Sequence, residues 1–107
     1  MTSDARDAYA VVIPAFNAAA TLGEAIGSLR RQSVPPAQII VVVDGSTDGT
    51  AGVARACGAD VRVIVQDNAG PGAATTRGLA EVGTPLLAFL DADDLWLPHK
   101  AQRQIED

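Results

Sequence analysis

Residues 38–50 read QIIVVVDGSTDGT, and this stretch decides the fold class. Five apolar residues in a row, with no polar side chain among them, are typical of a strand that is buried on both faces. The run ends at Asp44, and the Gly, Ser and Thr residues that follow are typical of a turn leading into a helix. The stretch therefore predicts a strand of a parallel sheet that is covered on both sides.

Three other apolar runs repeat this pattern, at residues 10–13, 61–65 and 85–90. Segments with helical periodicity lie between the runs, at residues 21–32, 46–58 and 71–83. Strands that alternate with helices indicate βαβ units, in which the helices pack on both faces of a parallel sheet. The predicted fold class is therefore α/β, with a Rossmann-like parallel sheet.

The expected helices carry recognisable start and stop signals. Thr21 and Glu24 have the spacing of a capping box, Ser46 or Asp48 could cap the second helix, and Gly58 ends it. The side chains expected to face the sheet are Leu22, Ala25, Ile26 and Leu29 in the first helix, Val53, Ala54 and Cys57 in the second, and Ala73, Ala74 and Leu79 in the third.

Size and composition limit the function classes. With 107 residues, of which 48% are hydrophobic, the chain (1–107) forms one domain. The net charge of -5 and the scattered Lys and Arg residues argue against a nucleic-acid surface, and the single cysteine excludes a disulfide framework. No signal peptide or apolar run of membrane-spanning length is apparent, so we expect a cytoplasmic protein. The last helical pattern has no stop signal, so we expect a longer parent protein.

Polar or special residues follow every apolar run. They are Pro14 to Asn17 after the first, Asp44 after the second, Asp67 and Asn68 after the third, and Asp91 to Asp94 after the fourth. Ligands of open parallel sheets bind beyond the carboxyl ends of the strands, so this pattern predicts a binding crevice. For Asp67 and Asn68, a binding role and a simple polar turn are equally supported.

The sequence Asp91-Ala92-Asp93 concentrates negative charge at the end of the fourth run. If the chain stays extended through Ala92, both carboxylates point to the same side. They would offer Mg²⁺ or Mn²⁺ hard oxygen ligands and leave coordination positions open for a diphosphate. Such a tripeptide alone is more often a solvated turn, and its position after a buried strand favours the metal site.

Other ligand motifs fail on particular residues. An EF-hand that began at Asp44 would need Glu where Arg55 stands, and the stretch that begins at Gly70 departs from GxGxxG at Thr75. There is no P-loop. A Ser-His-Asp triad cannot be argued, because the only histidine, His99, follows Pro98 near the end of the chain. We expect His99 to lie on the surface.

Four stretches together resemble the start of family 2 glycosyltransferases, which have the GT-A fold. They are VVIPAFNAAATL (11–22), IIVVVDGSTDGT (39–50), NAGPGAATTRGLA (68–80) and LLAFLDADDLWLP (86–98). The resemblance covers about residues 10–100. It implies a nucleotide-sugar-binding domain that uses Mn²⁺ or Mg²⁺ to bind a UDP-, GDP- or dTDP-sugar. The sugar would pass to an acceptor hydroxyl with inversion.

The resemblance also implies roles for particular residues. Donor contacts would come from Pro14, Ala15, Phe16, Asn17, Asp44, Gly72, Arg77, Asp91 and Ala92, and the metal ligands would be Asp93 and Asp91. Asp44 would recognise the base, and Asp94 would support the metal ligands. The general base is expected beyond Asp107, so we assign no catalytic residue and expect the chain alone to catalyse little or nothing.

Several residues depart from the family pattern and leave alternatives open. Val43 stands where an acid is usual, Phe16 where Tyr is common, and Thr75 and Thr76 where Arg and Asn are frequent. These changes would suit a non-catalytic nucleotide-binding or assembly module, and an exposed sheet edge would favour self-association. A haloacid-dehalogenase-like phosphatase also uses DxD, but Leu95 stands where that class requires Thr or Val.

Overall fold

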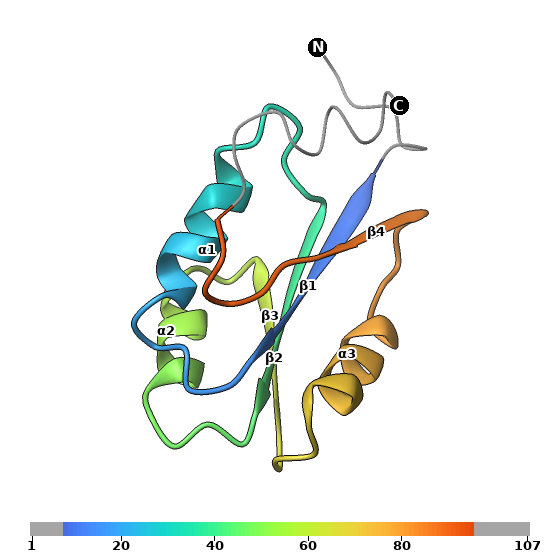
Figure 1. Cartoon of the computed structure of the whole chain (residues 1–107). Coiled ribbons are helices and arrows are strands. Elements are labelled where there is room, and N and C mark those ends of the chain that lie inside the picture. The colour runs from blue at the N-terminus through green and yellow to red at the C-terminus, as the bar shows by residue number, and fades with distance from the viewer. Residues whose placement is uncertain (1–7, 96–107) are drawn as a thin grey trace.

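The computed structural model describes residues 8–95 and contains a four-stranded sheet with three helices (Figure 1). The elements are β1 (Tyr9–Ala15), α1 (Leu22–Arg30), β2 (Gln38–Asp44), α2 (Thr50–Ala56), β3 (Val61–Gln66), α3 (Pro71–Leu79) and β4 (Leu86–Phe89). The strand order is β3-β2-β1-β4 and every pairing is parallel. The predicted α/β class and all four strands are confirmed.

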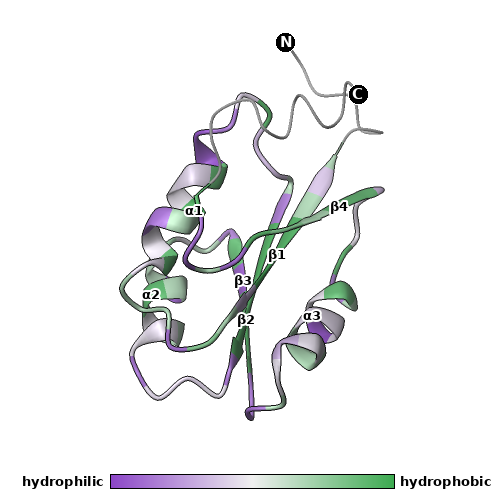
Figure 2. Ribbon diagram, in the orientation of Figure 1, coloured by the Kyte–Doolittle hydropathy of each residue, from purple (hydrophilic) through white to green (hydrophobic). Residues whose placement is uncertain are grey.

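Both faces of the sheet are covered, with α1 and α2 on one side and α3 on the other (Figure 1). Alternate residues of β1 enter two separate cores: Val11 and Ile13 pack toward α1 and α2, while Val12 packs toward α3. This two-sided burial holds for β1 and β2 and explains their apolar runs, which are mainly green in Figure 2. The prediction of strands covered on both faces is wrong for β4, in which Leu86, Leu87 and Phe89 are exposed.

The predicted helix faces are confirmed for α1 and wrong in part for α3. The four predicted α1 side chains are fully buried: Leu22, Ala25, Ile26 and Leu29. In α3 only Ala74 packs as predicted, because Ala73 and Leu79 are exposed and Gly78 is buried instead. A Cβ on Gly78 would lie 2.4 Å from Val12 Cγ1, so the missing side chain lets α3 approach the sheet closely.

The predicted caps are only partly correct. Thr21 occupies the N-cap position of α1 but makes no side-chain cap bond. Helix α2 begins at Thr50, later than predicted, with Gly49 at its N-cap. Asp48 nevertheless accepts the Thr50 backbone N–H at 3.0 Å, whereas Ser46 takes no part in capping that N–H.

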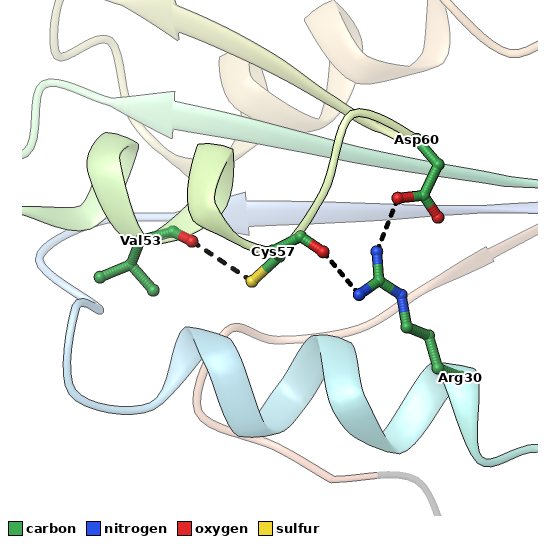
Figure 3. A network of polar contacts seen from close by, with 4 residues as sticks. All are labelled: Arg30, Val53, Cys57 and Asp60. Atoms are coloured by element: carbon green, nitrogen blue, oxygen red, sulfur yellow. Dashed lines mark hydrogen bonds and ion pairs between the residues drawn. The ribbon is translucent and has the colours of Figure 1, made fainter.

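An arginine joins the carboxyl ends of α1 and α2 (Figure 3). Arg30 Nη1 donates to the Cys57 carbonyl at 2.6 Å, and Nη2 pairs with Asp60 at 2.8 Å. The Cys57 thiol donates to the Val53 carbonyl at 3.2 Å. The Cys57 side chain is half-buried and packs against the core on this side of the sheet.

The strand order reverses at β1. From β1 the chain proceeds through β2 to β3, and β4 then returns to the opposite side of β1. In open parallel sheets the crevice at such a reversal, beyond the carboxyl ends of the strands, is where ligands bind. None of the helices within residues 8–95 has the length and apolarity that crossing a membrane requires.

Candidate functional site

Two open cavities lie at the carboxyl end of β1, and Pro14 and Phe16 line both of them. The first, of about 380 Å³, is also lined by Asn17, Ala18, Ala20, Thr21, Asp91, Ala92 and Asp93. The second, of about 360 Å³, is also lined by Ala15, Asp44, Asn68, Gly70, Pro71 and Ala74. The first cavity therefore faces the end of β4, and the second lies between the end of β2 and α3.

Three exposed carboxylates gather beside the first cavity. One oxygen from each of Asp91, Asp93 and Asp94 lies within 4.8 Å of the others. The Asp94 N–H donates to the Asp91 carbonyl at 3.0 Å, so the backbone makes a turn here. The expectation of an extended chain through Ala92 is therefore wrong, and the turn gathers a third acid beside the two predicted ones.

The acidic turn (residues 91–94) carries negative charge that no basic side chain among the described residues pairs with. Two like charges 4 Å apart repel by about 4 kcal/mol near a protein surface. Their grouping suits a small divalent cation, because carboxylate oxygens are the ligands that Mg²⁺ and Mn²⁺ prefer.

The centre of the acidic turn is attached to the rest of the fold. Ala92 is only 7% exposed, and its carbonyl accepts the Thr21 hydroxyl at 2.8 Å. Just before the turn, the buried Leu90 donates its N–H to the Val12 carbonyl at 3.2 Å. The three carboxylates thus project from a backbone whose apolar side chains are packed in the core.

Asp44 is a buried carboxylate at the edge of the second cavity. Its Oδ1 accepts Gln66 Nε2 and the Ala69 N–H, both at 2.9 Å, and its Oδ2 accepts the Gly70 N–H at 3.0 Å. These bonds, led by that of Gln66, lower the pKa of Asp44 and keep it ionised. A carboxylate has about four acceptor positions, so one is left for a ligand.

The loop after β3 depends on a glycine for its approach to β2. Gly45 has φ +70°, and a Cβ there would lie 2.6 Å from the Cβ of Asn68. Asn68 Nδ2 in turn donates to the Asp44 carbonyl at 3.2 Å. Of the two residues whose role the sequence left open, Asn68 lines the second cavity and Asp67 lines neither.

The segment DGSTDGT also holds the loop that connects β1 to α1, a role that its residue pattern did not predict. Asn17 has φ +49°, its N–H donates to Ser46 Oγ at 2.9 Å, and its Oδ1 accepts the Thr47 N–H at 2.8 Å. Asparagine adopts this conformation more readily than most residues. Asn17 thereby fixes the wall of the first cavity against the loop after β2.

The next two residues of the β1–α1 loop are held in the same way. The Ala18 N–H donates to Thr50 Oγ1 at 2.9 Å, and the Ala19 N–H donates to Asp48 Oδ2 at 3.2 Å. The buried Thr50 hydroxyl donates to Asp48 Oδ1, which lowers the pKa of that carboxyl group. One feature of the sequence could have predicted these bonds. The loop after β2 is rich in small residues with hydrogen-bonding side chains, and the β1–α1 loop has several backbone N–H groups that need acceptors.

Most of the predicted site residues come together, but two lie elsewhere. Pro14, Ala15, Phe16, Asn17, Asp44, Asp91, Ala92 and Asp93 all line one or both cavities. Gly72 and Arg77 line neither. Arg77 Nη1 lies 2.8 Å from the Glu81 carboxylate, which also pairs with Arg62 at 3.2 Å. Hydrogen bonding to Arg77 lowers the pKa of Glu81.

Comparison with known sequences gives a consistent family match. The sequence model described as Glycosyl transferase family 2 matches residues 10–107. An uncharacterized glycosyltransferase of Nostoc sp. is 39% identical over 100 residues, which cover 90% of this chain and 31% of that protein. The chain therefore spans about a third of the length of this relative.

Comparison with solved structures adds two similar folds. TarS 1-349 of S. aureus in complex with UDP-GlcNAc superposes with a TM-score of 0.81 at 24% identity, over 92% of this chain and 30% of that one. Glucosyl-3-phosphoglycerate synthase of Mycobacterium tuberculosis, in complex with Mn²⁺, UDP and phosphoglyceric acid, has a TM-score of 0.71 at 31% identity. The match covers 82% of this chain and 34% of the synthase.

Proposed function

The chain belongs to glycosyl transferase family 2, and from this premise we propose that it is the donor-binding part of a glycosyltransferase. It binds a nucleoside-diphosphate sugar through a divalent cation on Asp91 and Asp93. The observation that carries this proposal is the pair of adjoining cavities that share Pro14 and Phe16, with the acidic turn at one and the Asp44 carboxylate at the other.

The nucleotide base occupies the second cavity in this proposal. Phe16 is 55% exposed at the border of the two cavities and offers an aromatic surface. The remaining acceptor position of Asp44 suits a ring N–H such as that of uracil, thymine or guanine. UDP is favoured among these donors, since the M. tuberculosis synthase, at 31% identity, is solved with UDP and Mn²⁺.

The diphosphate lies against the first cavity, where the protein itself is acidic. Asp93 and Asp91 would hold Mn²⁺ or Mg²⁺, with Asp94 beside them. When bound, the cation supplies positive charge at the diphosphate oxygens, on which negative charge develops as the bond to the sugar breaks. The Asn17 loop and the acidic turn, which both line this cavity, orient the donor.

Transfer to an acceptor requires a group that takes the proton from its hydroxyl. We assign no general base within residues 8–95, and we propose that a carboxylate beyond Asp107 serves in the longer chains of the family. Inversion at the sugar is part of the same proposal. In this proposal the described residues bind and orient the donor, and other residues bind the acceptor.

A non-catalytic nucleotide-binding module is the second candidate. One observation favours it: Arg77, which by resemblance should lie near the sugar nucleotide, is paired with Glu81 instead. The two candidates share the base cavity and differ at the acidic turn. In the binding module the acids of the turn are relics that no longer hold a cation, whereas the donor site requires one.

Calorimetric titration of UDP, with and without Mn²⁺, tests the proposal. We expect manganese to tighten UDP binding by at least about tenfold, because a dication between the clustered carboxylates and the diphosphate attracts both and offsets part of the repulsion between them. Asp93→Asn should remove most of this gain. Asp60→Asn is the matched control, since Asp60 is an exposed acid that pairs with Arg30 and lines neither cavity. Equal UDP affinity with and without manganese would favour the binding module.

A further inference from the structure

We propose that Thr21 is a positioning residue for the acidic turn, and that its hydroxyl holds the backbone from which the metal-binding carboxylates project. Thr21 would act through the Ala92 carbonyl without touching the cation. The inference rests on the proposed function, because it assigns a role toward the cation that Asp91 and Asp93 are proposed to bind.

The first support is that Thr21 does not do what its sequence context predicts. It occupies the N-cap position of α1 with Glu24 at capping-box spacing, yet its side chain makes no cap bond. Its hydroxyl lies 2.8 Å from the Ala92 carbonyl and 3.5 Å from the Ala18 carbonyl. A hydroxyl has one hydrogen to donate, and the shorter distance assigns it to Ala92.

The second support is the place of Ala92 in the turn. Its carbonyl belongs to the peptide that joins Ala92 to Asp93, so a bond at this oxygen restrains the backbone between the two predicted ligands. The turn's own closing bond, from the Asp94 N–H to the Asp91 carbonyl, is local. Between described residues, the Thr21 bond is the one side-chain hydrogen bond that reaches the turn, and it spans 71 positions of sequence.

The third support is that Thr21 is itself held in place. The Ala18 carbonyl accepts the N–H groups of Thr21 at 3.1 Å and Leu22 at 2.9 Å. Ala18 in turn donates its N–H to Thr50 Oγ1, whose hydroxyl donates to Asp48. The start of α1 is therefore fixed to the loop after β2. Through its bond to the Ala92 carbonyl, Thr21 connects the acidic turn to this fixed segment.

The Thr21 bond should lower the entropy that the three carboxylates lose when they bind the cation. Three like charges repel one another, so an unrestrained turn would open when no cation is bound. A turn that is already held in its gathered form loses less freedom when the cation arrives. The Thr21 hydroxyl should therefore strengthen cation binding, and it should leave the base cavity, which it does not line, unaffected.

The test measures UDP affinity with saturating Mn²⁺ and without metal in four variants of the full chain. Thr21→Val removes the hydroxyl and keeps the shape of the side chain, and Thr21→Ser keeps the hydroxyl. Thr84→Val is the matched control, because the Thr84 hydroxyl donates to the Leu86 carbonyl at 2.7 Å, at the opposite end of β4. Asp93→Asn reports on the proposed metal site itself.

We expect Thr21→Val to reduce the manganese-dependent gain in UDP affinity by about threefold to tenfold, the usual range for one lost hydrogen bond. UDP binding without metal should change by less than about twofold, because Thr21 lines the first cavity but not the base cavity. Thr21→Ser should restore the gain. Thr84→Val should keep the full gain. General destabilisation would weaken UDP binding both with and without manganese. It would therefore not produce a loss that occurs only with manganese.

The variants separate failure of this inference from failure of the proposed function. If Asp93→Asn loses the gain while Thr21→Val keeps it, the positioning role is wrong and the metal site stands. If Asp93→Asn keeps the gain, the metal assignment is wrong and the role of Thr21 fails with it. Equal losses in Thr21→Val and Thr84→Val, or a loss in Thr21→Val that is the same without metal, would show a structural effect and overturn the inference.

Discussion

The carboxylate of Asp44 accepts the backbone N–H of Gly70 at 3.0 Å, so the last residue of β2 holds the residue that precedes α3. Asp44→Asn should disturb this arrangement, because its amide group would place a donor opposite a backbone N–H. We expect a lower melting temperature and UDP binding weakened by about tenfold. Calorimetry and thermal unfolding measure both effects.

The neighbouring acid provides the control for this change. Asp67 is exposed in the same loop and lines neither cavity, so Asp67→Asn should leave UDP affinity within about twofold of the parent. The assignment of the base cavity would be refuted if Asp44→Asn bound UDP as tightly as the parent chain.

The stability of the fold should fall in acid. Hydrogen bonds lower the pKa values of Asp44 and Asp48 below 3.8 in the folded state. The unfolded chain therefore binds more protons near pH 4, so these groups stabilise the fold above about pH 4 and lose that effect as the pH falls through their folded pKa values. Urea unfolding between about pH 2 and pH 7 should show a midpoint that drops below pH 4.

Asp48→Asn isolates one contributor to this pH dependence. The variant should be less stable than the parent near neutral pH, and the two should converge in acid, where Asp48 of the parent is protonated as well. A difference between the two proteins that stayed constant over the whole pH range would contradict the assigned role of the Asp48 carboxylate.

Gly78→Ala should destabilise the fold by about 1–3 kcal/mol, the usual cost of overpacking. Its Cβ would lie 2.4 Å from Val12 Cγ1 and 3.3 Å from Val42 Cγ2, between α3 and the sheet. Gly52→Ala is the matched control, because a Cβ there meets nothing within 4 Å and should stabilise α2 by about 0.5–1 kcal/mol. Opposite signs in urea denaturation are expected, and equal effects would refute the close approach of α3.

Arg30→Ala should cost more stability than Asp60→Asn. The ion pair between these residues is exposed and contributes about 0–1 kcal/mol, whereas Arg30 also donates a charge-assisted bond to the Cys57 carbonyl (Figure 3). We therefore expect about 1 kcal/mol for Arg30→Ala and under about 0.5 kcal/mol for Asp60→Asn. If urea unfolding showed the same loss of stability for both variants, the whole effect would belong to the ion pair.

Strands β1 and β2 were predictable because burial on both faces requires an uninterrupted run of apolar residues. The runs that contain Val11 and Val41 are apolar throughout, and the structure buries both residues completely. Family membership was predictable for a different reason, since four ordered stretches matched at once, and the family match confirms that resemblance and disfavours the phosphatase alternative. The strand order was not predictable, because no residue pattern within β4 indicates that this strand pairs with β1.

The contacts that the sequence did not predict involve side chains with more than one possible partner. Thr21 could bond to its own helix or to Ala92, and only the folded chain brings that carbonyl within reach. Arg77 has the helical spacing for a pair with Glu81, a competitor that the family resemblance does not reveal. The turn after Asp91 likewise depends on the burial of Ala92, which is a tertiary contact.

Locating manganese directly tests the central claim, that the acidic turn binds a cation that holds the donor diphosphate. Crystals of the chain grown with UDP and Mn²⁺ can be measured near the manganese absorption edge. We expect an anomalous peak in contact with the carboxylates of Asp93 and Asp91 and with the diphosphate, while the uracil lies beside Asp44. Bound UDP with no peak at these carboxylates, or a manganese peak elsewhere, would contradict it.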